Sequence, residues 1–220
     1  MNTAPGPGPL SDEADLRRPY AAPAQRSLDK EIGYLDGHCR AFIEHSPFAV
    51  LATSDGQGRV DVSPKGGPPG FIAVLDEHHL AVPDMAGNNR LDSLCNIVRS
   101  PGASLLFFIP GVGETLRVVG EAGATTDRSV LEACSAALPG IRANVAIVMA
   151  VSTAYIHCAK ALRRSGLWDP PSWPSTDDMP TTACMLRDHI GMQASEVESK
   201  QWLETSYEAT MWAVGGQAGA

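Results

Sequence analysis

The stretch that decides the fold reads FAVLATSDGQGRVDVSPKG and runs from Phe48 to Gly66. Its first part, Phe48–Ser54, is mostly apolar, and a later part, Arg59–Ser63, alternates polar and apolar residues. The Asp-Gly-Gln-Gly sequence between the two parts is typical of a turn, because glycine readily adopts the positive φ angles that tight turns need. The stretch therefore predicts an antiparallel β-hairpin whose second strand runs into Ser63-Pro64-Lys65.

Further strands and a few helices are predicted on both sides of this hairpin. Apolar residues at helical spacing predict helices that begin near residues 35 and 89, and Asp127 is a suitable N-cap for a third. Apolar or alternating runs predict the other strands, at residues 71–75, 80–82, 103–109, 115–122 and 145–156. Because strands and helices do not alternate regularly, the order favours a mainly β protein, an antiparallel barrel with flanking helices, over a doubly wound parallel sheet.

The chain divides into three parts by composition. Residues 1–26 are rich in proline and glycine and are predicted to form a flexible N-terminal arm. Residues 27–168 hold all the barrel elements. Residues 169–220 begin with a proline-rich linker and continue into a helical extension, whose last helix starts at the capping-box sequence Ser195-x-x-Glu198.

Composition excludes several classes of protein. The net charge of −8 argues against a protein that holds nucleic acid through its overall field. No apolar run is long enough to cross a membrane, and residues 1–9 lack the features of a signal peptide, so we expect a cytoplasmic protein. The five cysteines contain no Cys-x-x-Cys pair, and the histidines show no metal-ligand spacing, so no metal site is predicted.

Two clusters are candidates for an anion or a flat polar ring. At Ser63-Pro64-Lys65-Gly66 a strand ends in a hydroxyl, an ammonium and glycines whose backbone amides can face a ligand. The alternative is a strand end followed by an exposed loop. At Asn88-Asn89-Arg90 the predicted start of a helix offers free N–H groups beside an arginine, which suits a phosphate. The alternative is a simple asparagine N-cap.

A third cluster, from His157 to Trp168, follows the long apolar strand. It combines basic side chains with a tryptophan, and these could contact an aromatic ligand. Alternatively, the basic residues form a solvated rim and Trp168 packs in the interior. The sequences typical of dinucleotide, P-loop, α/β-hydrolase and zinc-peptidase sites are missing from the chain.

Taken in chain order, these clusters resemble the pyridoxamine 5'-phosphate oxidase-like family of FMN-binding split-barrel proteins. The resemblance extends from about Leu35 to Trp168. The segments that carry it are Ser63-Pro64-Lys65-Gly66, Gly87-Asn88-Asn89-Arg90 with Asp92-Ser93-Leu94, residues 105–111, residues 114–118 and residues 157–161. It implies a split antiparallel barrel that forms a homodimer, with two FMN sites at the interface and each site built from both chains.

The resemblance also implies roles for individual residues. Val62, Ser63, Pro64 and Lys65 would line the flavin ring, and Asn88, Asn89, Arg90 and Ser93 would hold its phosphate. Arg117, Lys160, Ser165 and Trp168 would approach from the partner chain. Val119 and Glu121 stand where the family often has an asparagine and a basic residue, and the residues that bind the substrate phosphate in vitamin B6 synthesis are not found.

Two hypotheses for the function remain. The first is an FMN-dependent oxidoreductase that moves a hydride between a small organic substrate and the flavin. Lys65 would stabilise the reduced flavin, and His157 or Lys160 would donate a proton, although His157 is also explained as a structural strand-end histidine. The second is a non-catalytic protein that binds or stores a flavin, the deazaflavin F420 or haem on the same barrel.

Overall fold

The computed structural model describes residues 12–85, 87–138 and 140–212. The predicted N-terminal arm and the predicted C-terminal extension both continue outside these residues. Within them, the elements follow the predicted order. The helices are α1 (Glu13–Arg17), α2 (Gln25–Asp29), α3 (Gly37–His45), α4 (Asp92–Arg99), α5 (Arg128–Ser135), α6 (Lys160–Ser165), α7 (Thr182–Ile190) and α8 (Glu196–Thr210), with a 3-10 turn, η1 (Pro170–Ser172).

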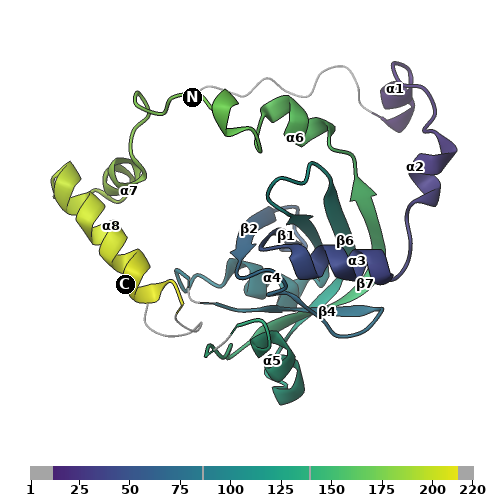
Figure 1. Cartoon of the computed structure of the whole chain (residues 1–220), viewed down its shortest axis with the longest axis horizontal. Helices are drawn as coiled ribbons and strands as arrows, with labels where there is room; N and C mark the ends of the chain where they lie inside the picture. Colours follow the sequence, from purple (N-terminus) through teal and green to yellow (C-terminus); the bar gives the residue numbers. More distant parts are fainter. Residues whose placement is uncertain (1–11, 86, 139, 213–220) are drawn as a thin grey trace.

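One seven-stranded antiparallel sheet forms the body of the molecule. Its strands are β1 (Phe48–Ser54), β2 (Val60–Gly66), β3 (Ala73–Val74), β4 (His79–Pro83), β5 (Gly102–Phe108), β6 (Thr115–Thr125) and β7 (Ala146–His157). Their order in the sheet is β2-β1-β5-β6-β7-β4-β3, and every neighbouring pair is antiparallel. The sheet curves around its core with helices at its ends (Figure 1). The predicted split antiparallel barrel with flanking helices is confirmed.

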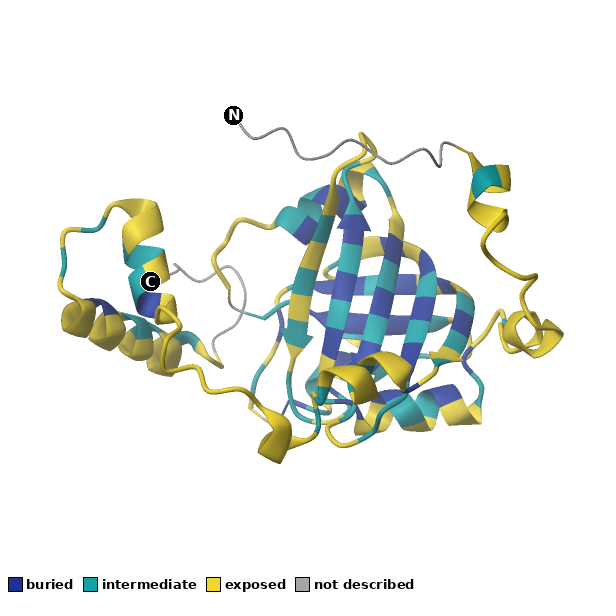
Figure 2. Ribbon diagram, turned by 90° about the horizontal axis from the view of Figure 1, so that it is seen from above, coloured by how far each residue is buried: buried dark blue, intermediate teal, exposed yellow. Residues whose placement is uncertain are grey.

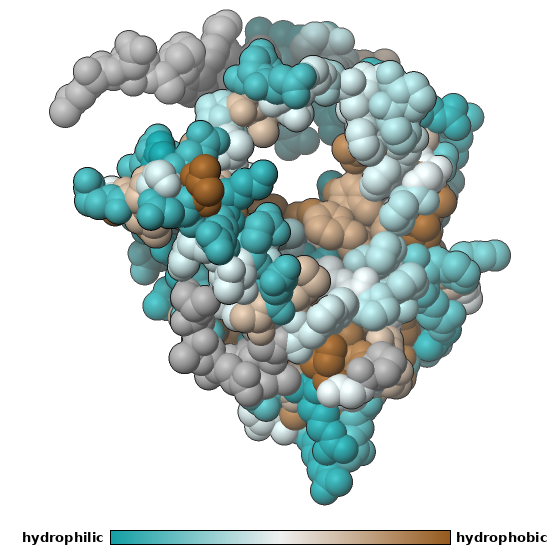
Figure 3. Space-filling view, turned by 60° about the vertical axis from the view of Figure 1, so that its left-hand side comes forward, coloured by the Kyte–Doolittle hydropathy of each residue, from teal (hydrophilic) through white to brown (hydrophobic). Residues whose placement is uncertain are grey.

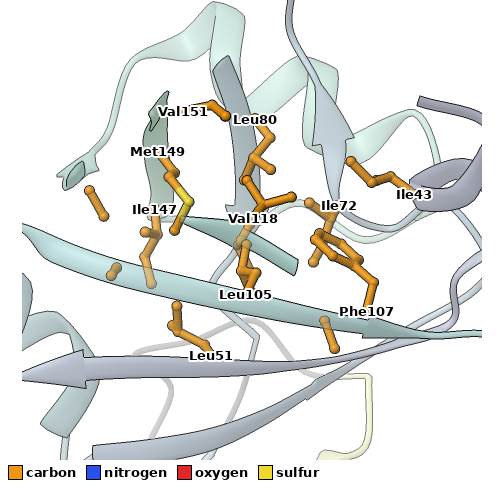
Figure 4. Close-up of a cluster of buried hydrophobic side chains, with 14 of the residues drawn as sticks. Ile43, Leu51, Ile72, Leu80, Leu105, Phe107, Val118, Ile147, Met149 and Val151 are labelled. Atoms are coloured by element: carbon orange, nitrogen blue, oxygen red, sulfur yellow. The ribbon is translucent and has the colours of Figure 1, made fainter. Parts of the chain in front are cut away.

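The core lies on the concave side of the sheet because strand residues alternate between the two faces. Along β1, for example, Ala49, Leu51 and Thr53 are buried and the residues between them are not, and this alternation is visible along the strands in Figure 2. Side chains from β1, β4, β5, β6 and β7 meet Ile43 of α3 in one cluster (Figure 4). Burying a side chain of this size stabilises the fold by about 1.5–3 kcal/mol.

Local sequence signals fix several element boundaries. The Asp36 carboxylate accepts a hydrogen bond from the backbone N–H of Cys39 at 2.8 Å and begins α3. Asp127 caps α5 as predicted, and Ser195 and Glu198 form the predicted capping box of α8. At the bulge between Val119 and Gly120, a β-carbon on Gly120 would overlap the Ala150 carbonyl, so this position requires glycine.

The terminal segments lie outside the barrel. Helices α1 and α2 contain no buried residue, and together with α7 and α8 they lie away from the sheet in Figures 1 and 2. An opening separates the C-terminal arm from the barrel in the space-filling view, and apolar residues form much of the surface on the barrel side (Figure 3). None of the described helices is long and apolar enough to cross a membrane.

Candidate functional site

The site begins at β2, the outermost strand of the sheet. β2 pairs with β1 along one edge only. Backbone N–H groups alternate in direction along a strand, and Pro64, which has no N–H, is tolerated where its nitrogen faces the unpaired edge. Gly67, an odd-numbered position, donates its N–H to Pro47 on the β1 side at 3.1 Å. The N–H groups of Val62 and Gly66 therefore face the open edge, where they can bind a ligand.

A cavity of about 500 Å³ lies along this open edge. Its walls come from three separate segments of the barrel domain, residues 61–66, 83–85 and 87–94 without Arg90, together with Phe71 and with Met211 from the end of α8. The volume falls within the roughly 300–1,000 Å³ that small-molecule and cofactor sites occupy. The fold thus brings the first two predicted clusters, Ser63-Pro64-Lys65 and Asn88-Asn89, to one cavity.

Lys65 carries the main positive charge in the cavity. Its side chain is on the same face of β2 as Asp61 and Ser63, and these three residues are half-buried whereas Val62 and Pro64 are exposed. Burial lowers the pKa of the Lys65 ammonium below its ordinary value of 10.5, and the charge of Asp84 partly opposes this shift. A desolvated ammonium attracts a nearby anion more strongly than one in water.

Asp84 follows the last residue of β4 and faces Lys65 across the cavity. Burial raises the pKa of its carboxyl above 3.8, while the charge of Lys65 acts to lower it. Its backbone N–H donates to the Val145 carbonyl at 2.9 Å, which fixes the chain at this point. We did not predict Asp84 from the sequence, and its only local signal is a polar residue directly after a strand.

The loop that precedes α4 is strained. Asn89 and Leu91 have φ angles of 54° and 57°, in the left-handed region that side-chain-bearing residues seldom adopt. Leu91 occupies the N-cap position of α4 without a side-chain hydrogen bond. The helix therefore begins at Asp92, and the prediction of a helix start near Asn89-Arg90 is wrong by about one turn. Strain of this kind concentrates at functional sites.

Arg90 does not line the cavity. Its Nε donates to the Asp92 carboxylate at 2.8 Å, and both side chains are largely exposed. The backbone N–H of Arg90 donates to the Asn88 side chain at 3.1 Å. Ser93, in contrast, is buried in the first turn of α4 and does line the cavity. Among the residues predicted to bind a phosphate, Asn88, Asn89 and Ser93 thus face the cavity, and Arg90 is paired beside it.

A buried polar contact fixes α4 against the hairpin. The Asn96 amide donates to Thr53 Oγ1 at 3.1 Å and to the Asp61 carboxylate at 3.2 Å. These bonds join α4, β1 and β2, so the strained loop and the open edge keep a fixed separation. The sequence gave no signal for this contact because its partners are 35 and 43 residues apart.

The other predicted site residues lie elsewhere in the chain. Arg117 and His157 are on β6 and β7, Lys160 and Ser165 are on α6, and Trp168 follows α6. None of these five residues lines the cavity. The Trp168 Nε1 donates to the Val112 carbonyl at 2.9 Å, which holds the end of this segment against the β5–β6 hairpin. One chain therefore contains two separate groups of predicted site residues.

Comparisons with known proteins give one family match. Residues 35–158 match the family described as Pyridoxamine 5'-phosphate oxidase. No curated protein sequence matches the chain. Among solved structures, HupZ of Group A Streptococcus is 18% identical, with a TM-score of 0.45 over 56% of this chain and 99% of HupZ.

Two further solved structures have similar values. A NimC/NimA family protein from Clostridium acetobutylicum is 18% identical, with a TM-score of 0.44 over 56% of this chain and 87% of its own. A protein titled F420 reductase is 15% identical, with a TM-score of 0.39 over 54% of this chain and 94% of its own.

Proposed function

Because the chain belongs to the pyridoxamine 5'-phosphate oxidase family, a flavin-binding family, we propose that its cavity binds FMN for the oxidation or reduction of a small organic substrate. The observation that carries this proposal is the desolvated Lys65 ammonium beside the open edge of β2, in the same cavity as the strained loop. When bound, FMN would supply hydride chemistry at its N5 atom, with oxygen or a nicotinamide cofactor completing the cycle.

The cavity residues fit the two ends of such a ligand. The N–H groups on the open edge of β2 would bind the polar edge of the ring, beside Ser63 and Lys65. The loop at Asn88-Asn89 and the first turn of α4, with Ser93, would bind the phosphate, because backbone N–H groups at a helix N-terminus favour an anion. Arg90 would then exchange its contact with Asp92 for the phosphate.

The charge of Lys65 would favour the reduced, anionic state of the cofactor. A fixed positive charge in a site sheltered from water stabilises developing negative charge without reorganisation. Asp84 would limit this effect and keep the ammonium protonated, since it raises the pKa of Lys65. Lys65 is thus the residue that we expect to tune the redox chemistry.

We also propose that the protein is a homodimer. The convex face of the sheet presents apolar side chains across β2, β1 and β5, where Pro64 is opposite Val50 and Val50 is opposite Leu106. Val62 on the same face is 64% exposed. An apolar patch of this kind on a sheet is typical of a protein interface. In the dimer, Arg117, Lys160, Ser165 and Trp168 would complete the partner's site.

A non-catalytic protein that binds FMN, F420 or haem is the second candidate. It is favoured by the position of His157, a predicted proton donor, which does not line the cavity of its own chain. Burial and the charges of Arg117 and Lys30 also lower the pKa of His157, which keeps its ring neutral. The second candidate needs no proton donor at the cofactor.

Anaerobic reduction separates the two candidates. FMN-loaded protein would be mixed with NADH or NADPH, or with panels of amines, alcohols and nitro compounds, and flavin absorbance would be followed before and after air is admitted. Bleaching by one donor and recovery with oxygen or a substrate supports the enzyme. FMN that stays bound and is never reduced supports the binding protein. Purification and assay from the cytoplasm would also test our proposed location, which agrees with five free cysteine thiols.

A further inference from the structure

Four side chains at one end of β6 and β7 form a compact group on the convex side of the sheet. Arg117 is opposite Tyr155 in the strand pairing, and its Nη1 donates to the Tyr155 hydroxyl at 2.9 Å. The Lys30 Nζ lies 5.0 Å from the centroid of the Tyr155 ring, the Arg117 guanidinium carbon 5.6 Å and the His157 ring 4.9 Å. We call Lys30, Arg117, Tyr155 and His157 the donor cluster.

Backbone contacts hold Lys30 in the donor cluster. Ile32 and Ala154 form an antiparallel bridge, with N–H···O distances of 3.1 and 2.7 Å in the two directions. The Lys30 Nζ also donates to the Ile156 carbonyl at 2.9 Å. Lys30 lies before residues 35–158, which match the family, so this cation is an addition to the part of the chain that the family shares.

The donor cluster has many hydrogen-bond donors and few acceptors. The guanidinium of Arg117 has five N–H groups and the ammonium of Lys30 has three, and neither group can accept a hydrogen bond. One donor of each is used, by the Tyr155 hydroxyl and the Ile156 carbonyl. The Tyr155 hydroxyl accepts from Arg117, so its own proton is available to a further acceptor. A group of this composition lacks an oxyanion.

Charge gives the same result. None of the ion pairs within residues 12–85, 87–138 and 140–212 involves Lys30 or Arg117. The pKa of His157 is lowered by burial and then by the charges of Arg117 and Lys30, with no carboxylate acting against them. The His157 Nε2 is buried without a hydrogen-bond partner. Buried polar atoms normally have a partner, so this nitrogen also indicates a missing group.

We propose that the donor cluster is a binding site for a small oxyanion, a phosphate or a carboxylate, separate from the flavin cavity. The planar fork of Arg117 suits two oxygens of such a group, and Lys30 supplies a second charge to it. The site goes beyond the proposed function, because it needs neither a flavin nor the residues of the cavity. Arg117 is the one residue that both proposals use.

Calorimetric titration of the full-length, FMN-loaded protein with inorganic phosphate and, separately, with benzoate tests this proposal. We expect one of the two anions to bind with a Kd of about 1 mM or lower. Binding of phosphate assigns a phosphate site, and binding of benzoate alone assigns a carboxylate site. Lys30→Met, which keeps the apolar stem, should weaken binding at least roughly tenfold, the effect of one charged hydrogen bond. Lys200→Met, an exposed lysine on α8, is the matched control and should bind like the wild type.

Tyr155→Phe provides a second variant that keeps the ring and removes the hydroxyl that positions Arg117. We expect it to weaken binding a few-fold and to leave the melting temperature nearly unchanged. The proposal is overturned if neither anion binds, or if Lys30→Met binds as tightly as Lys200→Met. It is also overturned if phosphate binds only to flavin-free protein and competes with FMN, since the donor cluster would then belong to the cofactor site. Flavin absorbance of each sample reports separately on the proposed function.

Discussion

At the scale of single residues, the site depends on how Lys65 and Asp84 share a partly dry environment. Burial disfavours the charged form of both side chains, and each charge partly relieves the other. Since the pKa of Lys65 in the folded protein is below 10.5, its contribution to stability is fully present above pH 10.5 and is lost as the pH falls through the lowered value. The folded protein thus gives up stability to keep a charge in the cavity.

Replacing Asp84 should change the titration of Lys65 in a known direction. Asp84→Asn removes the charge that raises the pKa of Lys65, so we expect this pKa to fall further below 10.5. NMR titration of the Lys65 ammonium in ¹⁵N-labelled, flavin-free protein measures the change. Asp92→Asn removes a carboxylate that lines the same cavity but does not act on Lys65, and it should leave the Lys65 titration in place. An unchanged or higher pKa in Asp84→Asn would show that the two groups do not interact.

Asp92 should compete with the cofactor phosphate for Arg90. The pair is exposed, and such pairs contribute at most about 1 kcal/mol. Asp92→Asn frees Arg90 and removes a negative charge, so we expect FMN to bind more tightly by a factor of about 3 to 10. Fluorescence titration of FMN measures this. Asp188→Asn, which breaks the similar Arg187–Asp188 pair far from the cavity, should have no effect. Weaker FMN binding in Asp92→Asn would argue against a phosphate at Arg90.

At the scale of elements, the sequence predicts strands well and the loop before α4 poorly. The alternation in β1 and β2 and the capping residues of α5 and α8 are local, and the structure confirms them. The apolar periodicity around α4 does not depend on the φ angle of a single residue, so it could not show that Leu91 turns left-handed and delays the helix to Asp92. Asp84 and Met211 reach the cavity through long-range folding, which no short pattern records.

The strain at Leu91 predicts an unusual preference for glycine. A left-handed residue with a β-carbon costs roughly 1–2 kcal/mol, so Leu91→Gly should be more stable to unfolding than Leu91→Ala by about 1 kcal/mol. Val98, which is exposed in the interior of α4, should show the opposite order, with Val98→Gly less stable than Val98→Ala by about 1 kcal/mol. Urea unfolding of the four variants measures both differences. The same order at both positions would mean that Leu91 is not strained.

At the scale of the whole molecule, one chain contains only part of the predicted site. The cavity along β2 and the group formed by Arg117, Lys160, Ser165 and Trp168 are separate in the chain, as expected if a second copy unites them. The resemblance to the family predicted both groups, but no sequence pattern shows which residues of one chain face another. The C-terminal extension reaches the cavity through Met211, which the sequence also did not predict.

A charge on the convex face should separate the dimer. Leu106 is opposite both Val50 on β1 and Arg117 on β6, near the centre of the apolar patch. Leu106→Glu would bury an unpaired charge in the interface, so we expect sedimentation to change from twice the 23.2 kDa chain mass to a single chain mass, with loss of FMN binding. Val98→Glu places the same charge on α4, outside the patch, and should remain dimeric. A dimer that persists in Leu106→Glu would place the interface on another face.

The central claim is that the cavity along β2 holds FMN, and mass spectrometry combined with an absorption spectrum of the purified protein tests it most directly. We predict a yellow protein with flavin absorption bands that releases FMN on denaturation, at about one FMN for each chain. A colourless protein whose melting temperature does not rise with added FMN would contradict the claim. A haem spectrum, or release of F420 in place of FMN, would contradict it as well and assign the cavity to that ligand.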